Sequence, residues 1–261
     1  MLSLRLLSAA VGIPLLALAV WFGSYWYLAP VVAIAVMGTW EFHRLLSPVT
    51  TTPPLLFSLA IVFGMTIPSH WEAEYLLIAL GAAILASLSW QITQEVRKKA
   101  AKAQFLGLVG PFYVGLPFSL AILLRDGIDG RDWMLAVLFA TFSIDTAAYA
   151  VGRLIGKHKL APRISPGKTW EGVVGGLVGG VGATFGITLV LGLPMSTWKA
   201  LPLGLLLAVA AMSGDLVESW LKRTAGAKDS GGLVPGHGGV LDRTDSVVAT
   251  LVVAYFWVMW V

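Results

Sequence analysis

Three aspartates toward the C-terminal end of the chain have the types and spacing that could support chemistry. Asp242 and Asp245 are separated by two residues, and a glycine-rich polar loop lies between them and Asp215. Carboxylate oxygens are the ligands that Mg²⁺ prefers, and a bound Mg²⁺ usually shares its shell with substrate phosphates and water. The pattern therefore predicts that the three carboxylates converge on a hard divalent cation.

Donors suited to phosphate oxygens accompany these acids. Arginine, lysine and histidine can all donate to phosphate, and glycines let backbone N–H groups come close to an anion. Arg243 could bind phosphate or simply hold the two neighbouring acids apart. The expected phosphate-binding residues of this loop and its flanks are Lys222, Arg223, Lys228, His237, Gly238, Gly239 and Arg243.

The segment before the loop places polar residues on one helical face. Asp215, Glu218, Ser219 and Lys222 follow the spacing i, i+3, i+4, i+7. An aspartate in hydrocarbon costs roughly 2.5 to 3.5 kcal/mol at a helix centre, so Asp215 is expected to face a polar cavity. The alternatives are a buried Asp215 paired with Lys222, and helix capping for Asp245.

A second basic stretch covers residues 153–172. Its Gly167-Lys168-Thr169 is no P-loop, because Pro162 stands where that motif requires a glycine. Ser165 and Lys168 are expected to hold phosphates. Intramembrane Asp145 is either a site candidate or a structural hydrogen-bond partner. His158 is expected to be a surface residue. Glu41 could face the site or lie at the membrane interface, and the interface is favoured.

These residues must be positioned by membrane helices. The chain is 57% hydrophobic, only 12% of its residues are charged, and its mean hydropathy is +0.81. Apolar runs of about 17 to 25 residues are typical of transmembrane helices. We predict an all-α polytopic membrane protein with about nine spans, at 4–23, 25–43, 54–69, 73–92, 103–124, 132–152, 172–193, 200–221 and 245–261.

Two of these spans are expected to be irregular. Prolines at both ends make the third short or tilted. The fifth contains Gly110-Pro111 and Gly115-Leu116-Pro117, which predicts a kinked or broken helix. In the seventh span, the spacing of Gly172, Gly176 and Gly180 favours close helix packing, within the fold or between protomers.

The distribution of basic residues predicts the orientation. With the N-terminus in the cytoplasm and the C-terminus outside, all but three of the 18 lysines and arginines fall on the inner side. The exceptions are Arg125, Arg131 and Lys199. Such a bias follows the positive-inside rule. We expect a single membrane domain, 1–261, whose catalytic half is about 140–261.

The polar residues also resemble a known signature. The residues that carry the resemblance are Ser219, Leu221-Lys222-Arg223, Lys228-Asp229, Gly231, Pro235, His237-Gly238-Gly239, Asp242-Arg243 and Asp245, together with Gly156 to Pro162 and Ser165 to Gly172. This pattern resembles that of the phosphatidate cytidylyltransferases, also called CDP-diacylglycerol synthases. It covers the C-terminal half strongly, whereas the N-terminal half matches only as a series of membrane helices.

The resemblance implies the reaction CTP + phosphatidate → CDP-diacylglycerol + pyrophosphate, dependent on Mg²⁺, at the cytoplasmic face of a membrane. Asp215 and Asp242 would be the main metal ligands, with Asp245 as a further ligand or support and Lys222 beside them as a catalytic cation. A second cation, K⁺ or Mg²⁺, is also implied. Ser219 belongs to the substrate-binding set. The expected partners are CTP, phosphatidic acid, membrane lipids and a second copy of the chain, with no nucleic acid, and the expected location is a bacterial inner membrane.

Other functions predict different patterns. A transporter of anionic substrates would show internal repeats and broken helices at the midplane, whereas these polar residues collect at one membrane face. A lipid-binding scaffold would not need Asp215 and Asp242. Another membrane-embedded, nucleotide-dependent lipid phosphate transferase is the nearest alternative, and CTP-dependent and phosphatidate-dependent release of pyrophosphate separates these possibilities.

Overall fold

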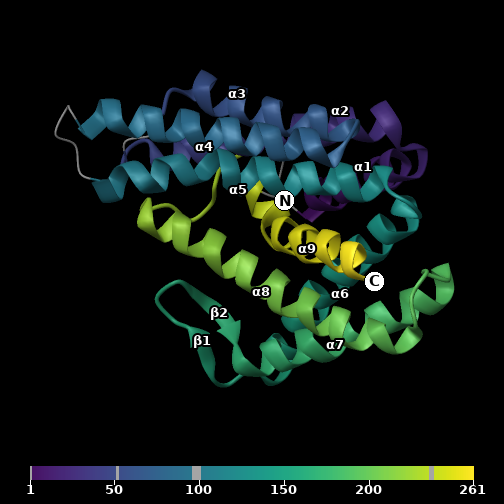
Figure 1. Ribbon diagram of the computed structural model, residues 1–261. Coiled ribbons are helices and arrows are strands. Elements are labelled where there is room, and N and C mark those ends of the chain that lie inside the picture. The colour runs from purple at the N-terminus through teal and green to yellow at the C-terminus, as the bar shows by residue number, and fades with distance from the viewer. Residues whose placement is uncertain (1, 51–52, 96–100, 235–237) are drawn as a thin grey trace. The chain divides into compact units, whose positions relative to one another are not determined.

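The computed structural model describes residues 2–50, 53–95, 101–234 and 238–261, with side chains omitted at 2–9, 94–95 and 101–107. Within these ranges the chain forms nine α-helices, two short 3₁₀ helices and one two-stranded hairpin (Figure 1). The predicted all-α class is confirmed. The hairpin was not predicted.

The helices follow the predicted spans closely, because each long apolar run forms one helix. Their bounds, with those of the other elements, are α1 Leu2–Phe22, α2 Ser24–Leu46, α3 Leu55–Thr66, η1 Pro68–His70, α4 Ala73–Glu95, α5 Ala101–Asp126, α6 Gly130–Ile155, β1 Lys159–Ala161, β2 Ser165–Thr169, α7 Trp170–Leu191, η2 Thr197–Lys199, α8 Ala200–Thr224 and α9 Leu241–Trp260.

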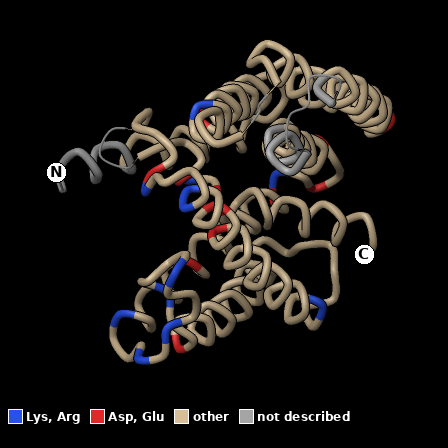
Figure 2. Tube along the Cα trace, turned by 90° about the vertical axis from the view of Figure 1, so that its left-hand side faces the viewer, with Lys and Arg blue, Asp and Glu red and all other residues tan. Residues whose placement is uncertain are grey.

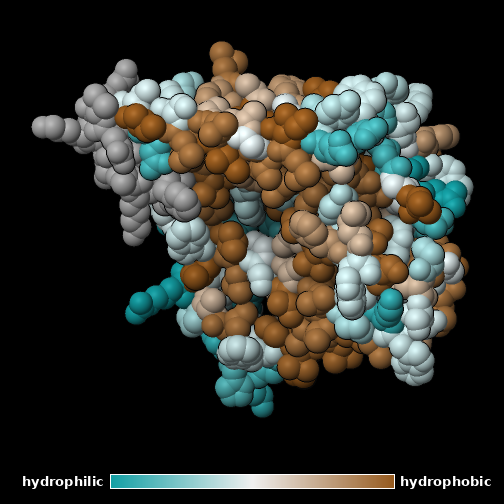
Figure 3. Space-filling view, viewed as in Figure 1, coloured by the Kyte–Doolittle hydropathy of each residue, from teal (hydrophilic) through white to brown (hydrophobic). Residues whose placement is uncertain are grey.

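The chain is an integral membrane protein by the length and composition of its helices. Five segments of the described chain are long and apolar enough to cross a membrane, at Ala73–Thr93, Leu108–Asp126, Gly130–Ile155, Trp170–Leu191 and Thr197–Thr224. Two shorter apolar segments lie at Ala10–Phe22 and Leu55–His70. Large apolar side chains such as Leu77, Leu85 and Val190 point outward from these helices, and apolar residues cover much of the face in Figure 3.

Two compact units make up the fold, and the chain passes between them three times. Unit 1 comprises residues 1–123 and 224–242, and unit 2 comprises residues 124–223 and 243–261. The loop after α8 therefore belongs with the N-terminal helices, whereas most of α9 belongs with α6, α7 and α8. The single domain expected from the sequence stays a prediction.

In unit 1, glycines of α5 serve helix packing. A Cβ at Gly110 would overlap the Phe42 ring of α2, and one at Gly115 would overlap the Met65 side chain of α3. α5 is a single continuous helix with both prolines inside it, so of the predicted kink or break the break is wrong, and the kink stays a prediction. The glycines that suggested a break instead let neighbouring helices approach. The third span is short, as predicted, because α3 ends at Thr66 and η1 follows.

In unit 2, the glycine rows of α7 are helix contacts. A Cβ at Gly179 would lie 2.5 Å from the Ala147 Cβ of α6, and one at Gly180 would lie 3.1 Å from the Ala208 Cβ of α8. Close packing within the fold is therefore confirmed for these glycines. Packing between protomers stays a prediction.

The hairpin links α6 to α7. β1 and β2 are antiparallel, with Lys159 opposite Thr169 and Ala161 opposite Ser165. Thr169 then caps α7, because its Oγ1 accepts a hydrogen bond from the Gly172 N–H at 3.1 Å. Lysines and arginines gather along the hairpin (Figure 2). One of them, Lys168 of β2, contacts Asp215 of α8.

Candidate active site

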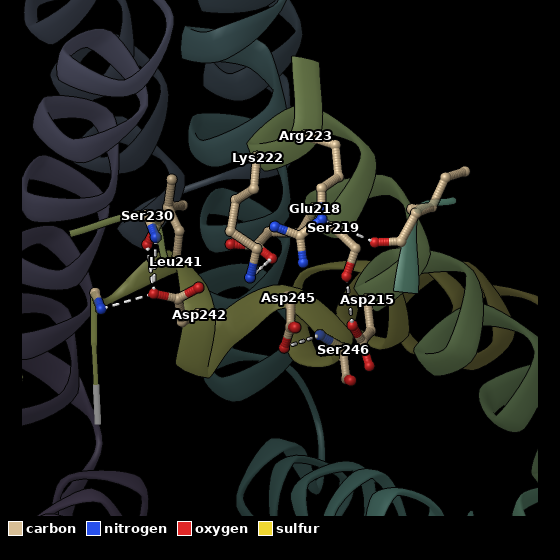
Figure 4. A network of polar contacts seen from close by, with 12 residues as sticks. Asp215, Glu218, Ser219, Lys222, Arg223, Ser230, Leu241, Asp242, Asp245 and Ser246 are labelled. Atoms are coloured by element: carbon tan, nitrogen blue, oxygen red, sulfur yellow. Dashed lines mark hydrogen bonds and ion pairs between the residues drawn. The ribbon is translucent and has the colours of Figure 1, made fainter. Parts of the chain in front are cut away.

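One face of α8 carries the polar residues that the sequence placed there. The Ser219 hydroxyl donates to Asp215 Oδ1 at 3.3 Å, and Lys222 Nζ lies 2.5 Å from Glu218 Oε2 (Figure 4). Both contacts join residues four positions apart, which are neighbours on a helix surface. The Glu218 side chain is only 2% exposed, so its charge is balanced by Lys222 in a nearly dry environment.

A different lysine approaches Asp215. Lys168, on β2, places its Nζ 2.9 Å from Asp215 Oδ2 and 3.5 Å from the Met212 carbonyl oxygen. The alternative in which Asp215 pairs with Lys222 is therefore wrong: Lys222 pairs with Glu218. The hairpin thus places a cation beside the predicted metal ligand, and phosphate binding by Lys168 stays a prediction.

A second contact fixes the hairpin to α8. Arg223 Nε donates to the carbonyl oxygen of Ile164, in the turn between the two strands, at 3.1 Å. Ser165 follows this turn and is half-buried. Ser165 and Lys168, which the sequence predicts to bind phosphate, therefore lie on a hairpin that contacts the C-terminal end of α8.

Two further carboxylates of unit 2 lie near Asp215. Asp145 of α6 accepts a hydrogen bond from the Ser246 hydroxyl at 3.1 Å, and Asp245 Oδ1 accepts from the Ser246 N–H at 2.8 Å. Asp245 interacts repulsively with both Asp145 and Asp215 and attractively with Lys222. α9 can come this close to α8 because a Cβ at Gly214 would overlap the Asp245 carbonyl oxygen.

These contacts bear on the roles that the sequence left open for Asp145 and Asp245. Asp245 lies one turn inside α9, which begins at Leu241, so it is not the helix cap. Asp145 has the structural hydrogen bond and also lies within electrostatic reach of the other two acids. The structural hydrogen bond of Asp145 is therefore confirmed, whereas its role as a site residue stays a prediction.

Asp242 belongs to a separate network in unit 1. Its Oδ2 accepts hydrogen bonds from the Ser230 N–H at 2.9 Å, the Ser230 hydroxyl at 3.0 Å and the Gly239 N–H at 2.8 Å (Figure 4). Gly238 has φ +88°, which a side chain rarely adopts, and a Cβ there would lie 2.8 Å from the same oxygen. Asp242 therefore holds the two sides of the loop together.

Glu41 is the residue whose role sequence reasoning missed. It lies on α2 with no exposed surface, and its Oε2 accepts hydrogen bonds from the Leu241 N–H at 3.0 Å and the Ser230 hydroxyl at 3.3 Å. The interfacial interpretation is wrong for Glu41. An acid inside an apolar run was a usable signal, but its partners lie far along the chain.

The remaining predicted residues have simpler settings. Lys228 and Arg243 are exposed, and His158 is exposed with its Nδ1 2.7 Å from Glu171 Oε1, which confirms it as a surface residue. His237 lies outside the described residues. Lys228 and Asp229, which are both described, form no ion pair with each other.

The donor chemistry suits a hard cation, although the ligand set stays a prediction. In the described parts of the chain, no group of three or more Asp, Glu, His or Cys side chains is arranged to hold a metal ion. Nevertheless, Asp145, Asp215 and Asp245 repel one another, and a cation among them would relieve that repulsion.

Comparison with known sequences gives the family. A sequence profile described as "Cytidylyltransferase family" matches residues 3–261. The chain belongs to the cytidylyltransferase family. The resemblance found in the C-terminal half thus extends over nearly the whole sequence, including the N-terminal helices that carry Glu41.

Named relatives are similar over most of their length. A phosphatidate cytidylyltransferase of Brucella suis biovar 1 is 35% identical over 240 residues, which cover 91% of this chain and 86% of the relative. One of Staphylococcus haemolyticus is 34% identical over 227 residues, covering 86% and 85%. One of Mycobacterium leprae is 34% identical over 218 residues, covering 77% and 69%. The cytidylyltransferase family thus accounts for both halves of the chain.

Proposed function

We infer that this chain is a phosphatidate cytidylyltransferase, which transfers CMP from CTP to phosphatidic acid and releases pyrophosphate. The observation that carries this inference is the family match over residues 3–261, together with relatives of that name that align along most of the chain. The acids and cations that gather at α8 and the hairpin are the kinds of groups that such a reaction needs to bind phosphates and a metal ion.

The reaction requires charge control more than a strong base. A phosphate oxygen of phosphatidate, already ionised at neutral pH, attacks the α-phosphorus of CTP. A new P–O bond forms, the bond between the α-phosphorus and its bridging oxygen breaks, and pyrophosphate leaves with the electron pair. The obstacle is the approach of one anion to another, so positioned cations are the main contribution expected of the protein.

Lys168 is the cation best placed for this task. It pairs with Asp215 and lies on a hairpin whose turn accepts a hydrogen bond from Arg223. Charge-assisted bonds from lysine and arginine to phosphate are strong and directional. We assign phosphate binding to Lys168, Lys222, Arg223 and Lys228, with Ser165, Ser219, His237, Arg243 and the Gly238-Gly239 backbone completing the substrate pocket.

The acids fit a divalent metal by their donor type. We propose that Asp215, Asp242 and Asp245 hold Mg²⁺, with room for a second cation, K⁺ or Mg²⁺. When bound, Mg²⁺ would offset the charge of the triphosphate and of the departing pyrophosphate. Asp145 is a further acid of the same cluster, and the Ser246 hydroxyl orients it.

We also propose nine spans with the N-terminus in the cytoplasm and the C-terminus outside. The support is the bias of basic residues toward the segments around α2, the hairpin and the α8–α9 loop. This orientation places the acids and the hairpin lysines where CTP is available. A bacterial inner membrane, contact with its lipids and assembly as a homodimer belong to the same proposal.

The test is an assay of the full chain in detergent. We expect pyrophosphate release that requires CTP, Mg²⁺ and phosphatidate together, with CDP-diacylglycerol formed in equal amount. Release that is equal without phosphatidate would remove the lipid from the reaction. No release under any condition would contradict the assignment as a whole.

A further inference from the structure

Glu41 lies in unit 1 with two oxygens in very different environments. Its side chain is fully buried, and Oε2 accepts from the Leu241 N–H at 3.0 Å and the Ser230 hydroxyl at 3.3 Å. Among the described residues, Oε1 has no hydrogen-bond partner. Burying a carboxylate costs free energy unless its hydrogen bonds are well made. We therefore expect that Glu41 has a role that offsets this cost.

The loop is shaped to fit around this carboxylate. A Cβ at Gly231 would lie 2.5 Å from Glu41 Oε1, and a Cβ at Gly239 would lie 2.5 Å from Glu41 Oε2 and would overlap the Ser230 Oγ. Real Cβ atoms essentially never approach that closely. These two glycines therefore permit the backbone to pack directly on Glu41 from two sides.

The same loop groups also reach a second carboxylate. Ser230 and Gly239 donate to Asp242 Oδ2 at 2.8 to 3.0 Å. The Ser230 hydroxyl lies 3.3 Å from Glu41 Oε2 and 3.0 Å from Asp242 Oδ2. It therefore contacts both acids, and its single proton is donated to one of them at a time. A shift of the loop at Glu41 is thereby passed to Asp242, at the start of α9.

We propose that Glu41 is a positioning residue, which fixes the loop between α8 and α9 and thereby the carboxylate of Asp242. The inference rests on the proposed function, in which Asp242 is a metal ligand. Among the described residues, both donors to Glu41 are neutral, so its role is that of a hydrogen-bond acceptor, and an amide oxygen of the same reach can replace it.

The experiment compares Glu41→Ala with Glu41→Gln in the full chain. Residues that orient metal ligands typically contribute about 10-fold to 100-fold to activity or metal affinity. We expect Glu41→Ala to lower kcat within that range and to raise the Mg²⁺ concentration for half-maximal rate. Glu41→Gln should stay within about 3-fold of the wild type, because its amide oxygen can still accept the hydrogen bond from the Leu241 N–H.

A second readout follows the loop without turnover. Lys228 lies in the loop and is exposed, so trypsin can cleave after it. We expect faster cleavage at Lys228 in Glu41→Ala than in the wild type and in Glu41→Gln, with other tryptic sites unchanged. The matched control is Thr39→Val, since Thr39 is also buried on α2 but donates only to the Ala35 carbonyl of its own helix.

The loop side gives an independent arm. Gly239→Ala disturbs the same contacts without changing α2, and it should reproduce both effects of Glu41→Ala even if that variant cannot be purified folded. Gly64→Ala is its control, because nothing lies within 4 Å of that Cβ.

The outcomes are distinct. If Glu41→Gln is as impaired as Glu41→Ala, the charge matters and the acceptor role is overturned. If Gly239→Ala and Glu41→Ala both keep wild-type kcat and cleavage, the positioning role is overturned. A wild-type chain that does not use phosphatidate contradicts the proposed function instead, while the cleavage readout still tests the contact between Glu41 and the loop.

Discussion

Asp215 is held between one hydroxyl and one ammonium group. Ser219 and Lys168 each contact one of its oxygens, so the chain's own side chains orient the carboxylate. A lysine that pairs with a predicted metal ligand can exchange that partner for phosphate when a cation takes its place. We therefore expect metal binding and phosphate binding to meet at Asp215.

The first prediction concerns this carboxylate. Asp215→Asn keeps the shape and the hydrogen bond from Ser219 but removes the charge, so turnover should be abolished while the protein remains folded and extractable. The measurement is CTP-dependent pyrophosphate release alongside size-exclusion chromatography in detergent. Near-normal activity would remove Asp215 from the metal site.

Glu218 and Lys222 lead to a second prediction. Removing one member of a buried ion pair costs about 3 to 5 kcal/mol, because the other charge is left without a partner. Lys222→Met should therefore lower the thermal stability, and adding Glu218→Gln should restore much of it, because both charges are then gone.

Activity separates the two roles of Lys222. If Lys222 also binds phosphate, the double variant regains stability but not turnover. Recovery of both together would limit Lys222 to a structural role. Thermal unfolding followed by fluorescence, with the pyrophosphate assay on the same samples, gives the two values.

The site could be predicted from the sequence only where residue type and local spacing carry the information. Asp215, Ser219 and Lys222 are neighbours on one helix, so their shared face follows from the periodicity. The contacts of Glu41 with Ser230 and Leu241 join residues about 200 positions apart. No local pattern encodes such a pairing, and Glu41 was consequently assigned to the interface.

At the scale of elements, helices were predictable because a membrane-spanning run of about 20 apolar residues is a strong signal. The hairpin was not, since its two strands have only three and five residues and contain one proline and two lysines. Of the kink or break expected in α5, the break was wrong for a related reason. Glycine next to proline is typical of a turn, but here Gly110 and Gly115 leave room for the side chains of neighbouring helices.

The packing of α7 gives a third prediction. A Cβ at Gly180 would lie 2.7 Å from Ile144 Cγ1, whereas nothing lies within 4 Å of one at Gly182, two residues along the same helix. Gly180→Ala should destabilise the protein by about 1 to 3 kcal/mol through overpacking.

The control for this prediction is built into the helix. Gly182→Ala should be neutral or slightly stabilising, because alanine is the better helix former. Detergent melting curves of the two variants make the comparison. Equal melting temperatures would mean that α6 and α7 are not packed as closely as described.

At the scale of the whole molecule, the absence of cysteine makes the topology accessible to experiment. Ile128, in the α5–α6 turn, is 88% exposed, and Lys157, before the hairpin, is also exposed. In cells, a membrane-impermeant maleimide should label Ile128→Cys directly and Lys157→Cys only after permeabilisation. The reverse pattern would invert the proposed orientation.

The alternation of the chain between its two units has a consequence for how the protein is made. At about 5 to 20 residues per second, a ribosome completes Leu241 roughly 10 to 40 s after Glu41, because 200 positions separate them. Throughout that interval the nascent N-terminal helices hold an acid whose hydrogen-bond donors do not yet exist. Unit 1 includes residues 224–242, which are among the last to be synthesised. A chain that stops before the α8–α9 loop therefore lacks the hydrogen-bond donors of Glu41.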